Sequence, residues 1–237
     1  MVRIAALYDV HGNLPALEAV LADVWAAEVD EIVVGGDVLW GPLQAECIER
    51  LRAAGATFVA GNCERDVLHT PGETQEWCAS RLDDDTRAFV ETWPASVERS
   101  VDGLGRVLFC HATPRSDEEI VTTLTPDEAV REAVGATEAD VVVCGHTHVQ
   151  FDRAVTGAPR LVNAGSVGLA YQGAPGAYWA LVTDEVEHRR TAYDVERTLD
   201  VLGSAGFPSF AEVFADSIRG LVAPEAAAES FERRRGS

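Results

Sequence analysis

The sequence predicts an α/β fold, and three observations support this prediction. Apolar runs of strand length alternate with amphipathic segments of helical length in the first half of the chain. Glycine-containing turns directly follow several of the apolar runs. After residue 148 the pattern changes to four strand-like runs joined by short loops. We therefore expect a parallel βαβαβ unit with right-handed crossovers, followed by a second, more antiparallel sheet.

The first half of the chain has clear helix boundaries. Asn13 is a suitable N-cap for the first helix, because its side-chain oxygen can accept a backbone N–H, and Gly55 closes the second helix. The predicted elements, in chain order, are a strand Val2–Tyr8, a helix Leu14–Ala27, a strand Glu31–Val34, a helix Gln44–Ala54 and a strand Thr57–Ala60.

Residues 64–96 interrupt this alternation and predict a helical insertion beside the site, with helical pieces Thr74–Ala79 and Asp83–Thr92. The elements expected beyond it are strands Ser96–Val101 and Arg106–His111, a helix Pro126–Val134, strands Asp140–Cys144, Val149–Val155, Arg160–Asn163, Ala177–Thr183 and Val186–Tyr193, and a helix Ser209–Val222. We expect one domain over residues 1–222 and a flexible, arginine-tipped tail over residues 223–237.

Composition excludes several classes of function. The net charge of −20 disfavours binding of DNA or RNA, which needs a basic surface. No apolar run approaches the roughly 20 residues that span a bilayer, and the chain enters a strand directly at Val2, so a cytoplasmic location is expected. The odd number of cysteines and their spacing do not predict a disulfide framework; they are Cys47, Cys63, Cys78, Cys110 and Cys144.

Five short polar motifs each follow an apolar strand-like run. Strand C-termini are where open α/β sheets build their sites, so these motifs are expected to meet at one edge. Their imidazoles, carboxylates and amide oxygen suit Mn²⁺, Fe or Zn²⁺, and they are numerous enough for two ions. The motifs are Asp9-Val10-His11, Gly36-Asp37, Gly61-Asn62-Cys63-Glu64, Cys110-His111 and Gly145-His146-Thr147-His148.

The order of these motifs resembles the calcineurin-like metallophosphoesterases, whose pattern is D-x-H, G-D, G-N-[H/C]-[D/E], a lone H and G-H-x-H. The resemblance extends from about Val2 to about Asp194. It is strongest for the small bacterial and archaeal phosphodiesterases with cysteine in the third motif, which the stretches 111–115 and 163–168 also resemble. The resemblance implies a four-layer α/β/β/α sandwich of two facing mixed sheets.

The resemblance also implies a role for each motif residue. Asp37 would bridge two divalent cations, with Mn²⁺ favoured and Fe, Zn²⁺ or Ni²⁺ as alternatives, and a hydroxide between them would attack phosphorus. The ligand set implied for one ion is Asp9, His11 and His148, and for the other Asn62, His111 and His146. Glu64 is expected to support a ligand rather than to be one.

Cys63 departs from the larger phosphatase branch of the family, which has a histidine there to protonate the leaving group. A thiol with a pKa near ~8.5 is a poor substitute, so substrates with good leaving groups, or diesters, are favoured. Two interpretations of Cys63 stay open: a small packed side chain or a participant in the chemistry. Arg65 and Arg115 follow motif residues, and either could bind phosphate or form a surface ion pair.

The function expected from these observations is that of a dinuclear metal-dependent phosphoesterase, and most of all a phosphodiesterase acting on a small phosphorylated metabolite or nucleotide. The alternatives are a phosphomonoesterase and a non-catalytic metal-binding scaffold of the same fold. No nucleic-acid polymer or membrane is expected as a partner, and a homo-oligomer is compatible with the sequence. Tyr171 and Gln172 either border the pocket or pack within their loop.

Overall fold

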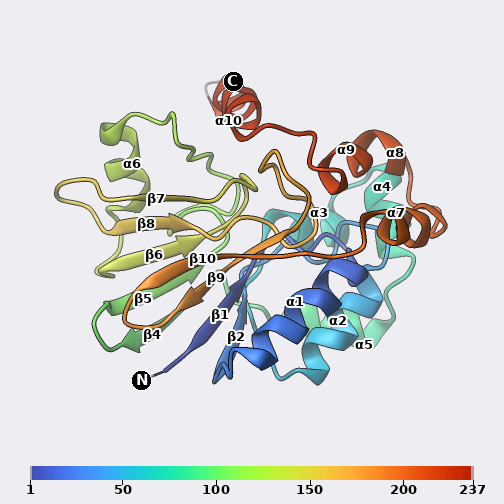
Figure 1. The fold of residues 1–237 in the computed structure, drawn as a ribbon, viewed down its shortest axis with the longest axis horizontal. Helices are drawn as coiled ribbons and strands as arrows, with labels where there is room; N and C mark the ends of the chain where they lie inside the picture. The colour runs from blue at the N-terminus through green and yellow to red at the C-terminus, as the bar shows by residue number, and fades with distance from the viewer. Residues whose placement is uncertain (1, 236–237) are drawn as a thin grey trace.

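The computed structural model describes residues 2–235, which form two β-sheets with helices on their outer faces (Figure 1). The strands are β1 (Ile4–Leu7), β2 (Glu31–Val34), β3 (Thr57–Phe58), β4 (Ser96–Val101), β5 (Gly105–Cys110), β6 (Val141–Cys144), β7 (Phe151–Arg153), β8 (Arg160–Asn163), β9 (Ala177–Val182) and β10 (Val186–Thr191). The helices are α1 (Leu14–Ala26), α2 (Gln44–Ala53), α3 (Asn62–His69), α4 (Glu73–Ala79), α5 (Asp84–Val90), α6 (Asp127–Val134), α7 (Val195–Gly203), α8 (Phe210–Val213), α9 (Ala215–Ile218) and α10 (Pro224–Arg235).

Each sheet combines parallel and antiparallel strands. The first has the order β10-β9-β1-β2-β3, in which β1, β2 and β3 are parallel and β9 is antiparallel to both of its neighbours. The second has the order β4-β5-β6-β8-β7, with parallel β5, β6 and β8 and an antiparallel strand at each edge. The predicted sandwich of two mixed sheets is therefore confirmed.

Alternation along β1 shows how the layers are held together. Ile4 and Ala6 belong to the apolar core between the two sheets, whereas Ala5 and Leu7 face the core beneath the helices of the first sheet. This is the period of two that places successive strand side chains on opposite faces. A third core lies between α6 and the outer face of the second sheet. Burial on both faces explains why the central strands contain almost only apolar residues.

The prediction that the last four strands form a sheet of their own is wrong. β7 and β8 join β6, while β9 crosses back to pair with β1, so that Ile4 lies opposite Val182. β9 is buried along its whole length, from Ala177 to Val182, because it is an inner strand covered on both faces. The first sheet is thereby completed by strands distant in sequence, whereas the second is built from the consecutive strands β4 to β8.

The C-terminal region is more helical than predicted. The helix expected over Ser209–Val222 is divided into α8 and α9, and α7 precedes them. Residues 224–235 form helix α10 instead of the expected flexible tail, because Ala227, Ala228 and Phe231 are buried against the rest of the molecule. Residues 236 and 237, the end of that expected tail, lie outside the described residues.

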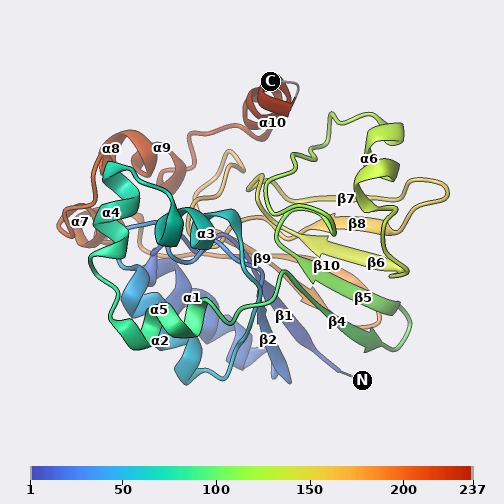
Figure 2. The same ribbon diagram turned by 180° about the vertical axis from the view of Figure 1, so that it is seen from behind.

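The insertion is helical, as predicted, and begins earlier than residue 64, because α3 starts at Asn62. Viewed from behind, α4 and α5 lie on the same side of the molecule as α1 and α2 (Figure 2). The first helix of the insertion, α3, contacts Asp37 through Cys63 and Glu64. At the other end of the insertion, Trp93 and Ala95 line a pocket together with His111. The expectation that the insertion flanks the site therefore holds for its two ends.

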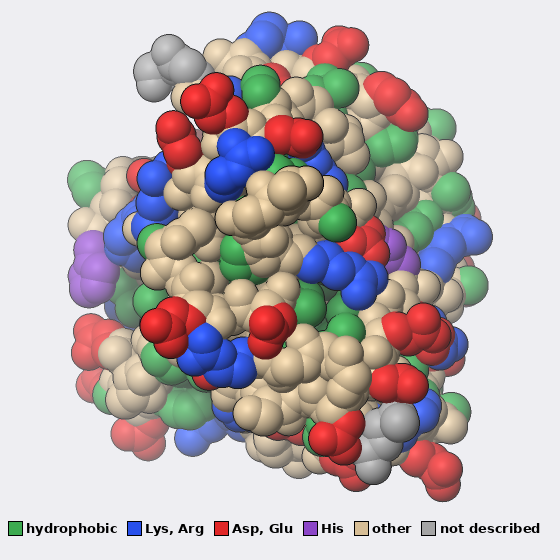
Figure 3. All heavy atoms as spheres, turned by 90° about the vertical axis from the view of Figure 1, so that its left-hand side faces the viewer, with side chains coloured by type: hydrophobic (Ala, Val, Ile, Leu, Met, Phe, Trp, Pro, Cys, Tyr) green, Lys and Arg blue, Asp and Glu red, His purple; other side chains and the backbone are tan. Residues whose placement is uncertain are grey.

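Charged side chains are mixed on the surface. On the face that contains α6 and β7, arginines and acidic residues alternate without a continuous basic area (Figure 3). Within residues 2–235, no helix is both long enough and apolar enough to cross a bilayer.

Candidate metal centre

The polar motifs come together beyond the carboxyl ends of five strands. Asp9 and His11 follow β1, Asp37 follows β2, and His111 follows β5. His146 and His148 follow β6, and Asn62 is the first residue of α3, after β3. The centre thus takes side chains from both sheets, so it exists only when the two sheets face each other. All seven side chains predicted as ligands lie here; their binding of metal stays a prediction.

Two groups of donor atoms overlap the two predicted ligand sets. In the first, one atom each of Asp9, His11 and His148 lies within 4.8 Å of the others. In the second, the same holds for Asp37, His111 and His146. The Asn62 side-chain oxygen joins the second group, 3.1 Å from His111 Nε2.

Asp37 lies between these groups. Its Oδ1 is 3.4 Å from His111 Nε2, and its Oδ2 is 3.9 Å from His11 Nε2. A third group within the same 4.8 Å limit contains His11, Asp37 and Cys63. The carboxylate thus directs one oxygen toward each half of the site, which is the arrangement that a bridging ligand needs.

The backbone is strained where these side chains project. Within residues 2–235, seven residues other than glycine have positive φ, and five of them are predicted ligands: Asp9, His11, Asp37, His146 and His148. Such conformations cost free energy and persist when the surrounding structure enforces them, and they are concentrated at functional sites. They allow side chains at i and i+2 to leave the strand pattern, so that Asp9 and His11 both enter the first donor group while His146 and His148 enter different groups.

Backbone carbonyls orient the imidazole rings. His11 Nδ1 is 3.0 Å from the Trp40 oxygen, His111 Nδ1 is 2.9 Å from the Gly35 oxygen, and His148 Nδ1 is 2.7 Å from the Leu169 oxygen. An N–H at Nδ1 that donates to a carbonyl leaves Nε2 as the free ligand atom, and it faces the centre in each case. His11 Nε2 and His148 Nε2 are only 3.2 Å apart, which suits two lone pairs directed at one cation.

The electrostatics of the centre also fit cations. Asp9 is fully buried, and its Oδ1 has no hydrogen-bond partner within the described structure. Burial raises the pKa of Asp9 and lowers the pKa of both His11 and His148, so these groups lack compensating charge. Although burial opposes it, the Asp37 carboxylate raises the pKa of His111 to about 10. A divalent cation would take the place of that proton and would provide the missing partner for Asp9.

Glu64 organises the backbone around Asp37. Its carboxylate accepts four backbone N–H groups: from Gly61 at 2.7 Å, Asp37 at 2.8 Å, Val38 at 2.7 Å and Leu39 at 3.1 Å. The side chain is 2% exposed, so water does not substitute for these bonds. Glu64 also lies in the first turn of α3, where a carboxylate stabilises the helix. The expected supporting role of Glu64 agrees with this geometry, because it touches the ligand loops rather than the centre.

The loop after β8 holds Asp9 in place. Ser166 Oγ donates to the Asp9 carbonyl at 2.8 Å, and the Gly168 N–H donates to the same oxygen at 3.0 Å. A side chain at residue 168 would collide with the Val10 carbonyl, since an added Cβ would lie 1.9 Å from it. Only glycine therefore permits this approach. These contacts explain Ser166 and Gly168 within the stretch 163–168 in physical terms.

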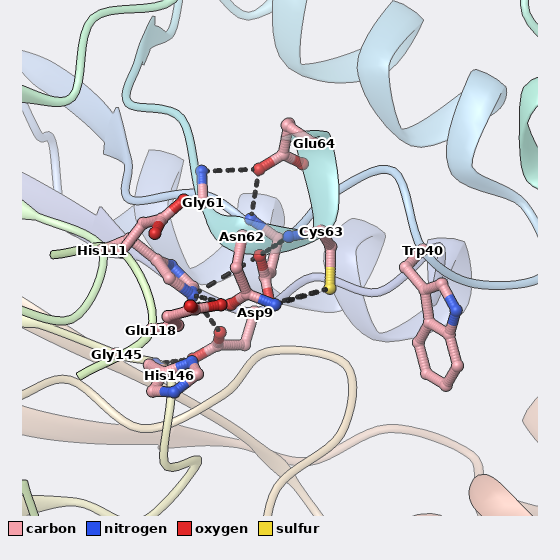
Figure 4. A network of polar contacts seen from close by, with 12 residues as sticks. Asp9, Trp40, Gly61, Asn62, Cys63, Glu64, His111, Glu118, Gly145 and His146 are labelled. Carbon is pink, nitrogen blue, oxygen red and sulfur yellow. Dashed lines mark hydrogen bonds and ion pairs between the residues drawn. The ribbon is translucent and has the colours of Figure 1, made fainter. Parts of the chain in front are cut away.

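Cys63 contacts the same carboxylate as the histidines. Its N–H donates to Asp37 Oδ1 at 2.9 Å and its thiol to Asp37 Oδ2 at 3.0 Å. Burial and the adjacent Asp37 charge raise the pKa of the thiol well above its usual range, so it is protonated at neutral pH. Cys63 is close enough to act in chemistry and is also packed, so both interpretations from the sequence stay open. Figure 4 shows its sulfur on the side of the centre that faces Trp40.

The two arginines predicted as phosphate ligands are engaged with acidic residues. Arg65 donates to Asp117 and, at 2.8 Å, to Glu118. Arg115 donates through Nε to Glu119 at 2.9 Å. Arg115 also lines the pocket beside His111. Of the two roles considered for each arginine, the surface ion pair is the one that the structure contains.

Aromatic residues border the centre on two sides. Tyr171 stacks on His148 with ring centroids 4.9 Å apart, and Trp40 meets His11 edge to face at 5.8 Å. Phe231 of α10 lies 6.1 Å from His146. Tyr171 therefore borders the site, as one of its two interpretations proposed. Trp40 and Phe231 were missed: Trp40 follows the Gly36-Asp37 motif closely, but nothing in the sequence around Phe231 connects it to the centre.

Metal removal should lower the thermal stability. At a concentration one hundred times its Kd, a ligand that binds only the folded state adds about 2.7 kcal/mol to the free energy of unfolding. For a domain of this size that corresponds to a rise in Tm of roughly 5 to 10 °C. We therefore expect differential scanning fluorimetry to show this rise in Tm when Mn²⁺ is added to protein stripped with EDTA. Ca²⁺ is the control, because four imidazoles suit it poorly and it should give a much smaller rise. Equal melting temperatures with EDTA and Mn²⁺ would contradict a metal centre.

Comparison with known proteins agrees with this geometry. Residues 2–186 match the calcineurin-like phosphoesterase superfamily domain. An uncharacterised protein of Methanocaldococcus jannaschii is 26% identical over 234 residues, which cover 87% of this chain and 94% of that protein. A metallophosphoesterase from Sphaerobacter thermophilus has a similar structure, with a TM-score of 0.74 and 26% identity. The match covers 92% of this chain and 100% of the Sphaerobacter chain. A hypothetical protein from Pyrococcus horikoshii OT3 shares the fold, with a TM-score of 0.78 and 19% identity. The match covers 93% of this chain and 99% of the Pyrococcus chain. The chain therefore belongs to the calcineurin-like phosphoesterase superfamily.

Proposed function

We propose that this protein is a dinuclear metal-dependent phosphoesterase that hydrolyses phosphodiesters of a small metabolite or nucleotide. The observation that carries the proposal is the position of Asp37, whose carboxylate faces both groups of buried donors. Asp9, His11 and His148 would hold one cation, and Asn62, His111 and His146 the other. We favour Mn²⁺, because the donors combine imidazoles with carboxylate and amide oxygens and lack an obligatory thiolate.

Paired divalent cations, when bound, lower the pKa of water and neutralise charge on phosphoryl oxygens. The residues of the chain supply the rest. The carbonyl-anchored histidines keep their rings fixed, and Glu64 fixes the loop that presents Asp37, so the donors need no reorganisation before they act. A pocket of about 380 Å³ beside His111, lined also by Thr113 and Ser116, is large enough for a small ester.

Cys63 supports the preference for diesters. The leaving oxygen needs a proton or a cation as it departs, and this position holds a thiol that donates to Asp37 rather than an imidazole. A substrate with a good leaving group depends least on such a donor. We therefore propose that activated diesters are hydrolysed faster than alkyl monoesters.

The experiment is an activity screen of the metal-reconstituted protein. Bis(p-nitrophenyl) phosphate, p-nitrophenyl phosphate, β-glycerophosphate, cyclic nucleotides and dinucleotides are compared at equal concentration with Mn²⁺, Zn²⁺, Ni²⁺ or Fe²⁺. The proposal expects turnover of diesters in the presence of metal and its loss with EDTA. A strong preference for β-glycerophosphate would identify a monoesterase instead. Metal binding without turnover of any ester would favour a scaffold.

Substitution of Cys63 separates its two interpretations. Cys63→His should raise activity on monoesters more than on diesters, because an imidazole can protonate the leaving oxygen, whereas the thiol has a raised pKa. Initial rates on p-nitrophenyl phosphate and on bis(p-nitrophenyl) phosphate give the ratio of monoesterase to diesterase activity. Cys63→Ser and Cys63→Ala are the matched pair: if the thiol only packs, both keep most diesterase activity. A large loss in the alanine variant alone would show that a donor at this position takes part in the chemistry.

A further inference from the structure

Two backbone carbonyls orient the histidines of the first donor group. The Trp40 oxygen lies 3.0 Å from His11 Nδ1, and the Leu169 oxygen lies 2.7 Å from His148 Nδ1. Both carbonyls belong to loop residues, outside the helices and strands. The direction of a loop carbonyl depends on what packs against the loop, because no helix or strand ladder fixes it.

One segment of the chain packs against both of these loops. It comprises residues 207–220, which we call the C-terminal support, and it includes α8 and α9. The segment follows the residues that match the superfamily domain, which end at residue 186. Both ribbon views show α8 and α9 beside α4, on the same side of the molecule as α1 and α2 (Figure 1, Figure 2). Phe207 contacts Trp77 of α4, with ring centroids 5.3 Å apart.

Aromatic rings of the C-terminal support hold Trp40 in place. The Phe214 ring stacks on the Trp40 indole, with the centroids 6.0 Å apart and an angle of 22° between the planes. Phe207 meets the same indole edge to face at 5.1 Å. Phe214 is fully buried and Phe207 is 4% exposed, so close packing restricts both rings. Because the indole and the carbonyl belong to one residue, fixing the ring also restricts the carbonyl that orients His11.

A hydrogen bond from the C-terminal support fixes the second loop. Ser217 Oγ donates at 2.8 Å to the carbonyl of Ala170, the residue that follows Leu169. Ser217 is 4% exposed, so loss of its hydroxyl would leave the Ala170 carbonyl without an easy replacement by water. The two segments also approach closely at Gly220, where an added Cβ would lie 2.2 Å from the Pro175 nitrogen. The loop after β8 is therefore held from the side of the C-terminal support.

The second donor group is held by other parts of the chain. His111 Nδ1 is oriented by the Gly35 carbonyl at 2.9 Å, and Asn62 is the first residue of α3. Within residues 2–235, no hydrogen bond or ring contact joins the C-terminal support to Asn62, His111 or His146. The support is therefore one-sided. Through the two carbonyls it acts on two of the three ligands predicted for one cation, and on none of the three predicted for the other.

We propose that Phe214 and Ser217 are positioning residues for one cation only, the cation that Asp9, His11 and His148 would hold. This inference rests on the proposed dinuclear metal-dependent function and makes its two cations unequal. Imidazole ligands bind a divalent cation best when partners outside the coordination shell fix their rings, because less conformational freedom is then lost on binding. Loss of the C-terminal support should therefore weaken the binding of this cation and leave the other almost unchanged.

Calorimetric titration of Mn²⁺ into the metal-free full chain tests this asymmetry. The wild type should show two binding events. We expect Ser217→Ala to raise the Kd of one event about fivefold and Phe214→Leu to raise it about tenfold, while the other Kd stays within about twofold of the wild type. Ser217→Ala removes only a hydroxyl oxygen, so the test does not depend on whether the fold tolerates the larger change at Phe214.

Ser204→Ala is the matched control, because it removes a serine hydroxyl that also donates to a backbone carbonyl at 2.8 Å, at the C-cap of α7. It should keep both Kd values. Two single-site backgrounds assign the weakened event, since His146→Ala removes a donor of the second group and His148→Ala a donor of the first. Ser217→Ala should raise the Mn²⁺ Kd about fivefold in the His146→Ala background and change it less than about twofold in the His148→Ala background.

Unchanged Mn²⁺ affinity in Ser217→Ala would overturn the inference. Equal weakening of both binding events would also overturn it, because a general loss of stability rather than the position of Ser217 would then be responsible. The outcome is separable from that of the proposed function, since metal binding is measured without an ester. Selective weakening of one ion in a chain that hydrolyses no ester would refute the phosphoesterase and keep the inference. An active two-ion esterase in which Ser217→Ala affects both ions equally would do the reverse.

Discussion

Replacing Asp37 by asparagine is expected to abolish phosphoesterase activity, lowering kcat/KM by roughly 10³-fold or more, or about 4 kcal/mol. The amide keeps the size of the carboxylate and one oxygen, so it can still accept the Cys63 N–H that Asp37 Oδ1 accepts. It loses the negative charge and the second oxygen that faces His11. At least one of the two cations should therefore be lost. Kinetics with bis(p-nitrophenyl) phosphate and metal analysis by mass spectrometry measure both effects.

The control for this experiment is Asp85→Asn, which removes the same charge from an exposed position in α5. It should retain wild-type turnover and metal content. If Asp37→Asn still bound two ions per chain and retained wild-type turnover, the bridging role of Asp37 would be wrong.

Replacing Glu64 by alanine is expected to destabilise the loop that presents Asp37, although Glu64 is not itself a predicted metal ligand. The carboxylate accepts four backbone N–H groups, three of them in the loop that presents Asp37. Leaving buried donors without partners costs about 1–3 kcal/mol each. Water would enter the vacated space and offset part of this, so we expect a net loss of about 3–5 kcal/mol in the free energy of unfolding. For a domain of this size the corresponding fall in Tm is roughly 6–20 °C.

Glu64→Gln gives a sharper variant of the same test. It preserves the volume, but its single acceptor oxygen can serve only some of the four N–H groups, and its own N–H₂ would face the others. Its free energy of unfolding should therefore lie between that of the wild type and that of Glu64→Ala. The exposed Glu73 of α4, changed to glutamine, serves as the control. Thermal unfolding measures the loss of stability, and Mn²⁺ affinity measures the damage to the metal centre. Wild-type values of both for Glu64→Ala would show that the loop is held by other contacts.

Much of the fold follows from periodicity alone. The boundaries of β2 and β4 match the predicted strands, and Asn13 caps α1 through its side-chain oxygen, 3.2 Å from the Ala16 nitrogen. These features are local, because a strand or a cap depends on residues only a few positions apart. The strand partners are not local. The pairing of β9 with β1 joins Ile4 to Val182, and no pattern within either segment specifies the other as its neighbour.

For the site, the sequence by itself determined which residues are predicted to hold metal, and the structure brings all seven of them together. Asp9, Asp37, His111 and His146 could be selected before any coordinates, because ligand types recur at strand ends and in a family order. It also identified Glu64 as a supporting residue and left the roles of Arg65 and Arg115 open. The reason is that each motif is a short segment whose side-chain types and turn are readable locally.

Only the tertiary structure decided how these residues cooperate. It placed Asp37 between two donor groups, left Asp9 Oδ1 without a partner, and engaged Arg65 with Asp117 and Glu118. It also brought α10 and Phe231 to the centre, although they follow the last motif by more than 70 residues. Burial, charge and distance arise when segments remote in sequence pack together. These quantities depend on the whole fold and cannot be read from any one segment.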